Sequence, residues 1–200
     1  MLIGIQHGMG ESLLMAAWFW YFVLYSFLGF LVEVVFARIT HNPKRDRKCL
    51  YFLPLCPVYG LGVLLMLALP AARSNSWLLF LWAALSATGA EYLMDLFYDR
   101  VLGVSFWDYS HLPLNLHGRV CLLFSFSWGI LGLIAVRLVH PLAVELVSHI
   151  PQAVTLPAAL FLALDIGFSV FVLRRDGTTD ALMWYRRLPA RGARHSLPEK

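Results

Sequence analysis

Charged residues are scarce in this 200-residue chain: they make up 14 per cent of it, whereas hydrophobic residues make up 60 per cent. The mean hydropathy is +0.68, and these values lie far outside those of soluble globular domains. The composition therefore excludes an ordinary soluble protein. It indicates an integral membrane protein with little room for a soluble domain.

Motifs of several enzyme classes are also missing. The chain has no GxxxxGK[ST] segment, so it cannot use ATP in the manner of a P-loop protein. It also has no GxSxG, no HExxH and no paired CxxC segments. These absences weigh against a hydrolase, a zinc protease and a structural zinc site, but they leave a lipid-modifying activity open.

Cysteine and histidine offer little for a metal site. The three cysteines, Cys49, Cys56 and Cys121, fall on or near the side predicted below to be cytoplasmic. Thiols stay reduced in that compartment, so we expect no disulfide. His111 and His117 lack a metal-binding spacing such as HExxH. We expect neither a metal nor a cofactor.

Long apolar runs dominate what is present. A membrane helix needs about 20 mostly apolar residues, and five runs of the chain qualify. No Lys or Arg precedes the first run, so we expect it to remain as an anchor rather than to be cleaved as a signal peptide. The sequence predicts an all-α, polytopic transmembrane helical bundle over residues 1–173 and a basic cytoplasmic tail over 174–200. The predicted spans are 13–37, 54–72, 77–101, 119–139 and 154–173.

Basic residues fall mainly on one side of these spans. Of the 16 Lys and Arg residues, all but Arg73 and Arg137 lie in the first loop, in the third connection or in the tail. Loops rich in Lys and Arg stay in the cytoplasm, which predicts an outside N-terminus and an inside C-terminus in a bacterial inner membrane. The net charge of +4 then reflects contact with the lipid bilayer, and no nucleic-acid partner is needed to explain it.

The connection between the third and fourth spans carries an unusual set of polar groups close to the bilayer. It holds the segment Phe106-Trp107-Asp108-Tyr109-Ser110, then Asn115, then Arg119. Charged groups at membrane depth are costly and are usually paired, functional or both. Asp108 and Ser110 could equally cap a local turn, and this structural alternative stays open.

Carboxylates also occur inside the predicted spans. Glu33 lies about one turn from the cytoplasmic end of the first span, and Glu91 and Asp95 lie one turn apart on one face of the third. Two carboxylates so close repel each other if both are ionised, so one is expected to hold a proton or to meet a cation. Arg119 is the expected counter-ion for Asp108, Glu33 or Glu91, although Glu33 could instead have a purely structural partner.

Two prolines interrupt the start of the second predicted span. Each removes a backbone donor and crowds the preceding turn, so Pro54 and Pro57 cannot both lie within a regular helix. Non-helical backbone at membrane depth is tolerated only where it is buried in protein or lines a cavity. This stretch is either the irregular entry to the second span or a broken helix that shapes a pocket. We favour the pocket, with Cys56 and Tyr59 pointing into it. The candidate polar-site residues are Glu33, Tyr59, Glu91, Trp107, Asp108, Asn115 and Arg119.

The last two spans look less informative. In the fourth, Ser125, Gly129 and Gly132 belong to a row of small residues that is typical of a helix-packing seam. In the fifth, Asp165 and Ser169 are the internal polar groups, and we expect this span to lie at the periphery of the bundle.

The distinctive segments follow one another along the chain as Tyr25–Phe30 with Glu33, Pro54–Gly60, Glu91-Tyr92, Phe106–Ser110, Asn115 and Gly118–Cys121. In this order they resemble the bacterial family of putative ABC-transporter permeases, also called putative ABC-transporter type IV, over about residues 22–146. The resemblance implies a permease subunit that receives force from a separate nucleotide-binding ATPase. Cys49 and Leu53 replace two glycines of the family pattern, and we expect the tight turn at this point to be remodelled.

Functions from two other classes stay open. One is a membrane-embedded enzyme that acts on a lipid or isoprenoid head group at the cytoplasmic leaflet. Asp108 or Glu33 would be its general base, while Arg119 and Asn115 would hold a phosphate or an oxyanion. The other is a non-catalytic membrane assembly partner whose polar motif is structural. Five spans cannot divide into two equal repeats, so transport would require a homo-oligomer or a partner.

Overall fold

The computed structural model describes residues 2–41, 48–69 and 75–187. The prediction of an all-α protein is confirmed, because the described residues contain only two strands, of two residues each. The main helices are α1 (Leu2–Ile39), α2 (Pro57–Leu67), α3 (Ser76–Phe97), α4 (Leu122–Ile134), α5 (His140–Ser148) and α6 (Thr155–Asp176). The strands are β1 (Asn115–Leu116) and β2 (Val120–Cys121), and the short helical turns are Tyr98–Leu102, Ala135–Val139, Gln152–Val154, Thr179–Leu182 and Trp184–Arg187.

Four helical stretches of the described chain are long and apolar enough to cross a membrane. They are Gly10–Ile39, Ser76–Leu102, Leu122–Ser148 and Gln152–Asp176, and they overlap the first, third, fourth and fifth predicted spans. The second predicted span, 54–72, contains the 11-residue helix α2 and runs into 70–74, which lie outside the described residues. A count of five spans therefore stays a prediction.

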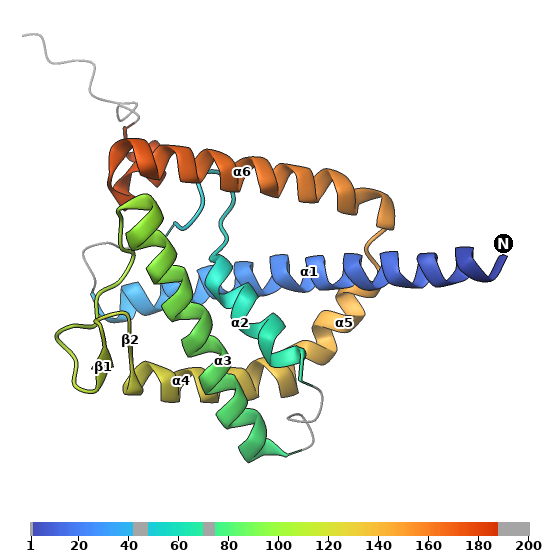
Figure 1. Cartoon of the computed structure of the whole chain (residues 1–200), viewed down its shortest axis with the longest axis horizontal. Helices are drawn as coiled ribbons and strands as arrows, with labels where there is room; N and C mark the ends of the chain where they lie inside the picture. The colour runs from blue at the N-terminus through green and yellow to red at the C-terminus, as the bar shows by residue number, and fades with distance from the viewer. Residues whose placement is uncertain (1, 42–47, 70–74, 188–200) are drawn as a thin grey trace, which may run out of the picture.

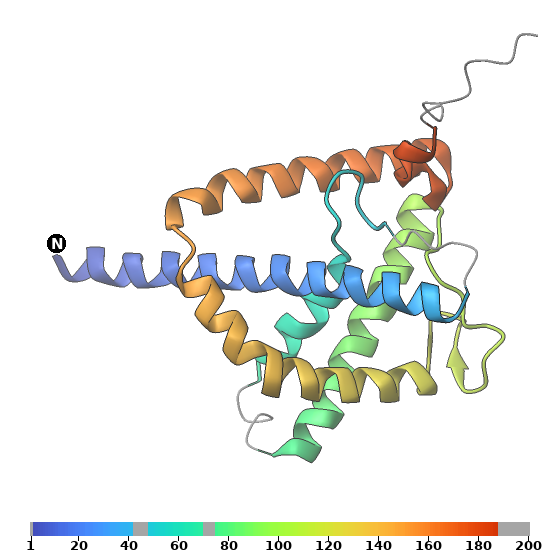
Figure 2. The ribbon, with the colours of Figure 1, turned by 180° about the vertical axis from the view of Figure 1, so that it is seen from behind.

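The helices form a bundle, and the connection between α3 and α4 lies at one end of it. In both views of the ribbon, α6 lies along one side, α4 and α5 lie along the other, and α1 runs between them (Figures 1 and 2). The C-terminal ends of α1, α3 and α6 and the start of α4 meet at the left of Figure 1. We call this the loop end. It is the end at which the β1–β2 hairpin lies.

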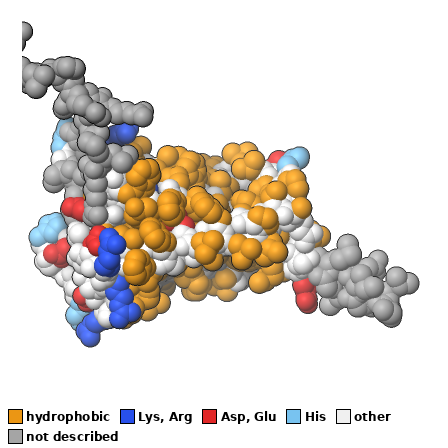
Figure 3. Space-filling view, turned by 90° about the horizontal axis from the view of Figure 1, so that it is seen from above, with side chains coloured by type: hydrophobic (Ala, Val, Ile, Leu, Met, Phe, Trp, Pro, Cys, Tyr) orange, Lys and Arg blue, Asp and Glu red, His pale blue; other side chains and the backbone are white. Residues whose placement is uncertain are grey.

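The surface matches a bilayer environment. Hydrophobic side chains cover the middle of the face seen in Figure 3, and basic side chains gather at one end of it. Large apolar side chains such as Leu85, Leu138 and Leu164 are 67 to 72 per cent exposed. Such residues on membrane-crossing helices contact lipid.

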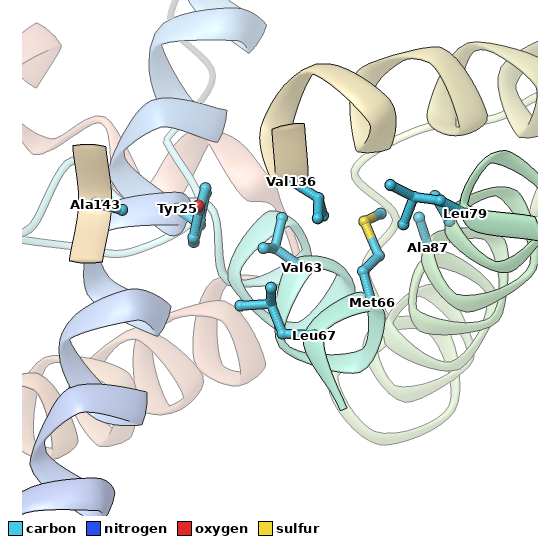
Figure 4. Close-up of a cluster of buried hydrophobic side chains, with 9 residues drawn as sticks. Tyr25, Val63, Met66, Leu67, Leu79, Ala87, Val136 and Ala143 are labelled. Atoms are coloured by element: carbon cyan, nitrogen blue, oxygen red, sulfur yellow. The ribbon is translucent and has the colours of Figure 1, made fainter. Parts of the chain in front are cut away.

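Although α2 is short, it lies at the centre of the core. Val63, Met66 and Leu67 of α2 pack against Tyr25 of α1 and against Leu79 of α3, as Figure 4 shows. Proline opens the helix at Pro57, where its missing N–H costs nothing. Packing on both neighbours explains how an 11-residue helix is held within the bundle.

Glycines permit close approach between the helices. A Cβ atom at Gly129 would lie 2.4 Å from Cε2 of Phe80, and one at Gly132 would lie 2.3 Å from Cβ of Ala83. The predicted packing seam of α4 is thus confirmed, with α3 as its partner. A Cβ at Gly29 of α1 would lie 2.2 Å from Cγ of Tyr59. That contact brings the ring of Tyr59 against α1.

The segment before α2 is not helical, as the two prolines predicted. Asp165 of α6 accepts hydrogen bonds from the backbone N–H groups of Phe52 (2.9 Å) and Leu53 (2.7 Å), and Ser169 accepts one from that of Tyr51 (2.8 Å). The residue Asp165 is 1 per cent exposed. Because buried N–H groups need partners, α6 stabilises the irregular backbone. The sequence analysis did not predict this role.

Candidate functional site

The segment between α3 and α4 folds as a compact unit, which we call the motif loop (residues 103–121). Its β1–β2 hairpin turns at His117 and Gly118, which both have positive φ, of 55° and 70°. The N–H of Arg119 donates to the carbonyl of Leu116 across this turn (3.1 Å). The N–H of Tyr109 donates to the carbonyl of Gly118 (2.7 Å). The two halves of the motif loop are therefore joined through their backbones.

Asp108 and Asn115 hold the shape of the motif loop. The carboxylate of Asp108 accepts a hydrogen bond from the N–H of Ser110 (2.8 Å), and this bond lowers the pKa of that exposed carboxyl group. Asn115 accepts from the N–H of Gly118 (2.9 Å) and donates to the carbonyl of Leu112 (2.7 Å). Both side chains thus serve local turns.

Arg119 pairs with two carboxylates of the helical stretch Ser76–Leu102. One of its terminal nitrogens contacts Asp95, which is 3 per cent exposed, and the other contacts Asp99 at 2.6 Å. These bonds raise the pKa of the guanidinium. The expectation that Arg119 pairs with Asp108, Glu33 or Glu91 is therefore wrong. The spacing of Glu91 and Asp95 predicted that one of them holds a proton or contacts a cation, and Asp95 contacts the cation Arg119.

Other candidate residues meet around a cavity of about 440 Å³, which we call the polar cavity. Its walls come from α1, α2, α3, α4 and the motif loop. The structure brings Glu33, Tyr59, Glu91 and Trp107 together there, whereas Asp108, Asn115 and Arg119 are not among its lining residues. The described lining residues are Val32, Glu33, Phe36, Val58, Tyr59, Glu91, Trp107, Tyr109, Phe124, Ser127, Trp128, Ile130 and Leu131.

Glu91 is the most enclosed acid of the polar cavity, at 4 per cent exposed. Its Oε1 accepts a hydrogen bond from the hydroxyl of Tyr109 (2.9 Å), and its Oε2 accepts one from Nε1 of Trp128 (2.8 Å). Burial and the nearby Glu91 raise the pKa of Tyr109, so the phenol remains a donor. Glu33 accepts a hydrogen bond from the hydroxyl of Tyr59 (2.9 Å). Both carboxylates are thus oriented by aromatic donors.

Aromatic rings make up much of the wall. Tyr109 and Phe124 stack with their centroids 4.7 Å apart, and Tyr59 and Trp128 meet edge to face at 4.9 Å. Phe36 of α1 contacts Phe124 of α4 in the same manner at 6.1 Å. These pairs tie α1, α2 and the motif loop to α4.

Four aromatic lining residues were not among the site residues predicted from the sequence: Phe36, Tyr109, Phe124 and Trp128. Tyr109 lies inside the motif loop segment that was singled out, so its position was a usable signal. Phe124 and Trp128 lie one turn apart on α4, but aromatic residues in an apolar helix have no feature that separates a cavity wall from a lipid contact. Cys56, which was expected to point into the pocket, is not among the lining residues. Its Sγ lies 2.9 Å from that of Cys49.

The parts of the chain that the structure describes contain no candidate metal site. No three His, Cys, Asp or Glu side chains there are grouped so that they could hold an ion. His117 instead contacts the hydroxyl of Tyr92, at 3.1 Å.

The fold and the site define an all-α membrane protein in which a motif loop at one end closes over a carboxylate-bearing, aromatic cavity. The chain belongs to the family described as Putative ABC-transporter type IV, whose model matches residues 20–172. The match confirms the resemblance and includes every described residue that lines the polar cavity. No curated protein and no solved structure matches the chain.

Proposed function

We propose that this chain is the permease subunit of a transporter, with the polar cavity as its substrate site and a separate ATPase as its source of energy. The observation that carries the proposal is the cavity itself. Five segments of the chain contribute to it, and it contains two carboxylates held by hydrogen bonds at the loop end of a membrane bundle. A concave, largely apolar site with a few oriented polar groups is typical of small-molecule binding.

The motif loop supports coupling to a partner. It lies at the loop end, outside the membrane helices, yet Trp107 and Tyr109 reach from it into the polar cavity. Arg119 of the same loop joins it to Asp95 and Asp99 of the helical stretch Ser76–Leu102. A protein that displaces the motif loop would therefore change the polar cavity directly, as an ATPase subunit must.

The distribution of basic residues supports a cytoplasmic loop end. Described basic residues at this end include Arg38, Arg100, Arg119 and Arg175, and positive loops stay inside. We therefore propose a multi-pass protein of a bacterial inner membrane with its N-terminus outside. A reporter enzyme fused after residue 200 tests this orientation, and reporter activity outside the cytoplasm would contradict it.

The lipid-modifying enzyme has less support than the permease. That hypothesis used Asp108 or Glu33 as the base and Arg119 with Asn115 as the anion site. Asp108 and Asn115 instead serve turns, and Arg119 contacts two carboxylates. A phosphate would have to compete with both of those carboxylates for the guanidinium. Of the four residues that this hypothesis uses, only Glu33 lines the polar cavity.

The test is a pull-down of the tagged chain from native membranes in a gentle detergent at natural expression levels. We expect a nucleotide-binding ATPase in near-stoichiometric amount, and we expect its ATP hydrolysis to change when the chain is removed. Cross-linking mass spectrometry of the purified complex would also show whether two copies of the chain are present. Repeated absence of an ATPase, with bound lipid recovered instead, would contradict the proposal and favour the enzyme.

A further inference from the structure

A second cavity of about 140 Å³ adjoins the polar cavity, and we call it the apolar groove. The two share Val32, Tyr59, Trp128 and Leu131 as lining residues. The other described residues of the apolar groove carry no charge; they are Tyr25, Leu28, Gly29, Val63, Met66, Gly132, Ile134, Ala135 and Val139. The two cavities therefore adjoin at these four residues, and one has a polar lining while the other has an apolar lining.

The apolar groove leads away from the loop end. On α1 its residues, 25–32, precede Glu33, while α1 runs towards the loop end. On α4 and the turn after it, its residues continue from Trp128 to Val139, while α4 runs away from that end. Both helices give the same direction. A ligand that occupied both cavities would place its polar group at the loop end and its apolar part towards the bilayer interior.

The charge of the polar cavity favours a cation. Its described lining includes Glu33 and Glu91 but no Lys, Arg or His. Glu91 is buried, and its two hydrogen-bond donors, Tyr109 and Trp128, are both neutral. Neutral donors orient a carboxylate without cancelling its charge. A cation that binds beside Glu91 would favour its ionised form, because an opposite charge nearby stabilises the charged state.

The rings of the polar cavity favour an organic cation over a metal ion. Tyr59, Trp107, Tyr109, Phe124 and Trp128 line it. Tyrosine and tryptophan faces attract ammonium groups, and rings grouped around one point are the usual way in which proteins recognise alkylated ammonium. A small divalent ion would instead need several oxygen ligands at short range.

The polar cavity has an edge on the lipid-facing surface. Val32 and Phe36 of α1 and Ile130 and Leu131 of α4 line it, and these side chains are between 37 and 44 per cent exposed. All four lie on membrane-crossing helices. An apolar chain can therefore enter sideways from the bilayer, between α1 and α4.

We infer that the two adjoining cavities together bind a single-chain amphiphile with an ammonium head group. The head lies among the rings beside Glu91 and Glu33, and the first methylenes of the chain lie in the apolar groove. This inference rests on the proposed function, since it names the substrate class of the same cavity. The ligand enters from the bilayer and carries one apolar chain.

The first experiment compares three probes on the unaltered full-length chain in nanodiscs of zwitterionic lipid. The probes are decyltrimethylammonium, decyl sulfate and tetramethylammonium. Binding is measured by titration calorimetry, with the heat of empty nanodiscs subtracted. We expect saturable binding of decyltrimethylammonium and at least about tenfold weaker binding of the other two. Equal binding of decyl sulfate, or no saturable binding of the ammonium probe, would overturn the inference.

The second experiment removes one carboxylate at a time. Glu91→Gln and Glu33→Gln are each expected to weaken decyltrimethylammonium binding about tenfold, because each removes a charge beside the head group. Glu145→Gln is the matched control, since Glu145 is exposed on α5 and does not line the polar cavity. Binding that is unchanged in both cavity variants would contradict the inference. Should Glu91→Gln fail to fold, Glu33→Gln and the probe series on the unaltered chain still decide the question.

The two proposals fail differently. An ATPase that co-purifies with a chain unable to bind decyltrimethylammonium overturns the ligand class and leaves the permease standing. Saturable, carboxylate-dependent binding by a chain that recovers no ATPase supports the ligand class and overturns the permease. Performing the pull-down and the titration with the same tagged full-length chain separates these results.

Discussion

The hydroxyl of Tyr109 donates a 2.9 Å hydrogen bond to the carboxylate of Glu91, and this bond connects the motif loop to α3 inside the polar cavity. The same tyrosine is fixed through its N–H to Gly118 and through its ring to Phe124. Tyr109 thus joins the motif loop to the polar cavity through a hydrogen bond to Glu91.

Replacing Tyr109 by Phe tests this connection. The ring and its stacking remain, but one oxygen of the buried carboxylate of Glu91 loses its donor, which costs about 1–3 kcal/mol. We expect a lower unfolding temperature in detergent and weaker binding of the ammonium probe. Tyr92→Phe is the control, because it removes a hydroxyl whose bond to His117 is exposed. Equal effects of the two substitutions would show that the Tyr109 bond has no special role.

The contact of Arg119 with Asp95 and Asp99 predicts strong coupling between these residues. Arg119→Ala is expected to destabilise the protein because Asp95 is buried and would lose its counter-ion. Asp95→Asn combined with Arg119→Ala should restore part of that loss, since no buried charge is then left unpaired. The four unfolding temperatures of this double-mutant cycle provide the measurement. Additive effects would contradict the pairing.

The sequence was a good guide to which residues of one helix share a face. Glu91 and Asp95 were expected on one face of the third span, and both point towards α4 and the motif loop, where they meet Trp128 and Arg119. The sequence could not identify the partners of these two carboxylates. Helical spacing says nothing of which neighbour a face meets, so Arg119 was assigned to the wrong acids.

Long-range contacts of the backbone could not be predicted from the sequence either. Asp165 stood out as a polar residue in an apolar helix, but its partners are backbone N–H groups 112 and 113 positions earlier. No side-chain pattern marks such partners. The short length of α2 is related, because residues 54–56, at the start of the predicted second span, are not helical and directly follow the segment that Asp165 stabilises.

Substitutions at Asp165 test this anchor. Asp165→Ala leaves the N–H groups of Phe52 and Leu53 without their acceptor, which we expect to cost about 3 kcal/mol, while Asp165→Asn keeps one acceptor and should cost less. Denaturant unfolding in detergent measures both. Glu145→Ala is the control, because the side chain of Glu145 is 77 per cent exposed on α5. An Asp165→Ala protein as stable as the control would argue against the anchor.

Cys49 and Cys56 offer a chemical probe of the same segment. Their Sγ atoms lie 2.9 Å apart, so we expect diamide to join them. Each thiol gives up one hydrogen, the two sulfurs form a bond, and the two hydrogens reduce the diamide to its hydrazine. Intact-mass analysis after alkylation in denaturant should show one labelled cysteine, Cys121. Three labelled cysteines after treatment would show that the two sulfurs do not lie close together. The Cys49→Ser variant is the control.

Substitutions of Asp108 test whether the motif loop is structural or performs chemistry. Its carboxylate accepts the N–H of Ser110, which lowers its pKa below the usual 3.8. A carboxyl group with a lowered pKa stabilises the fold above its usual pKa, and that contribution is lost as the pH falls through the lowered value. Asp108→Ala should therefore lower the unfolding temperature at pH 7 and abolish this acid-dependent part.

Asp108→Asn provides the discriminating comparison, because an amide oxygen can still accept from Ser110 while the charge is removed. If the carboxylate serves the turn, Asp108→Asn keeps most of the stability and of the ammonium binding, whereas Asp108→Ala loses both through the displaced Tyr109. If Asp108 were a general base, Asp108→Asn would fold normally and abolish turnover. Parallel measurements of unfolding temperature and of probe binding in the two variants therefore distinguish a loop that shapes the polar cavity from a loop that performs chemistry.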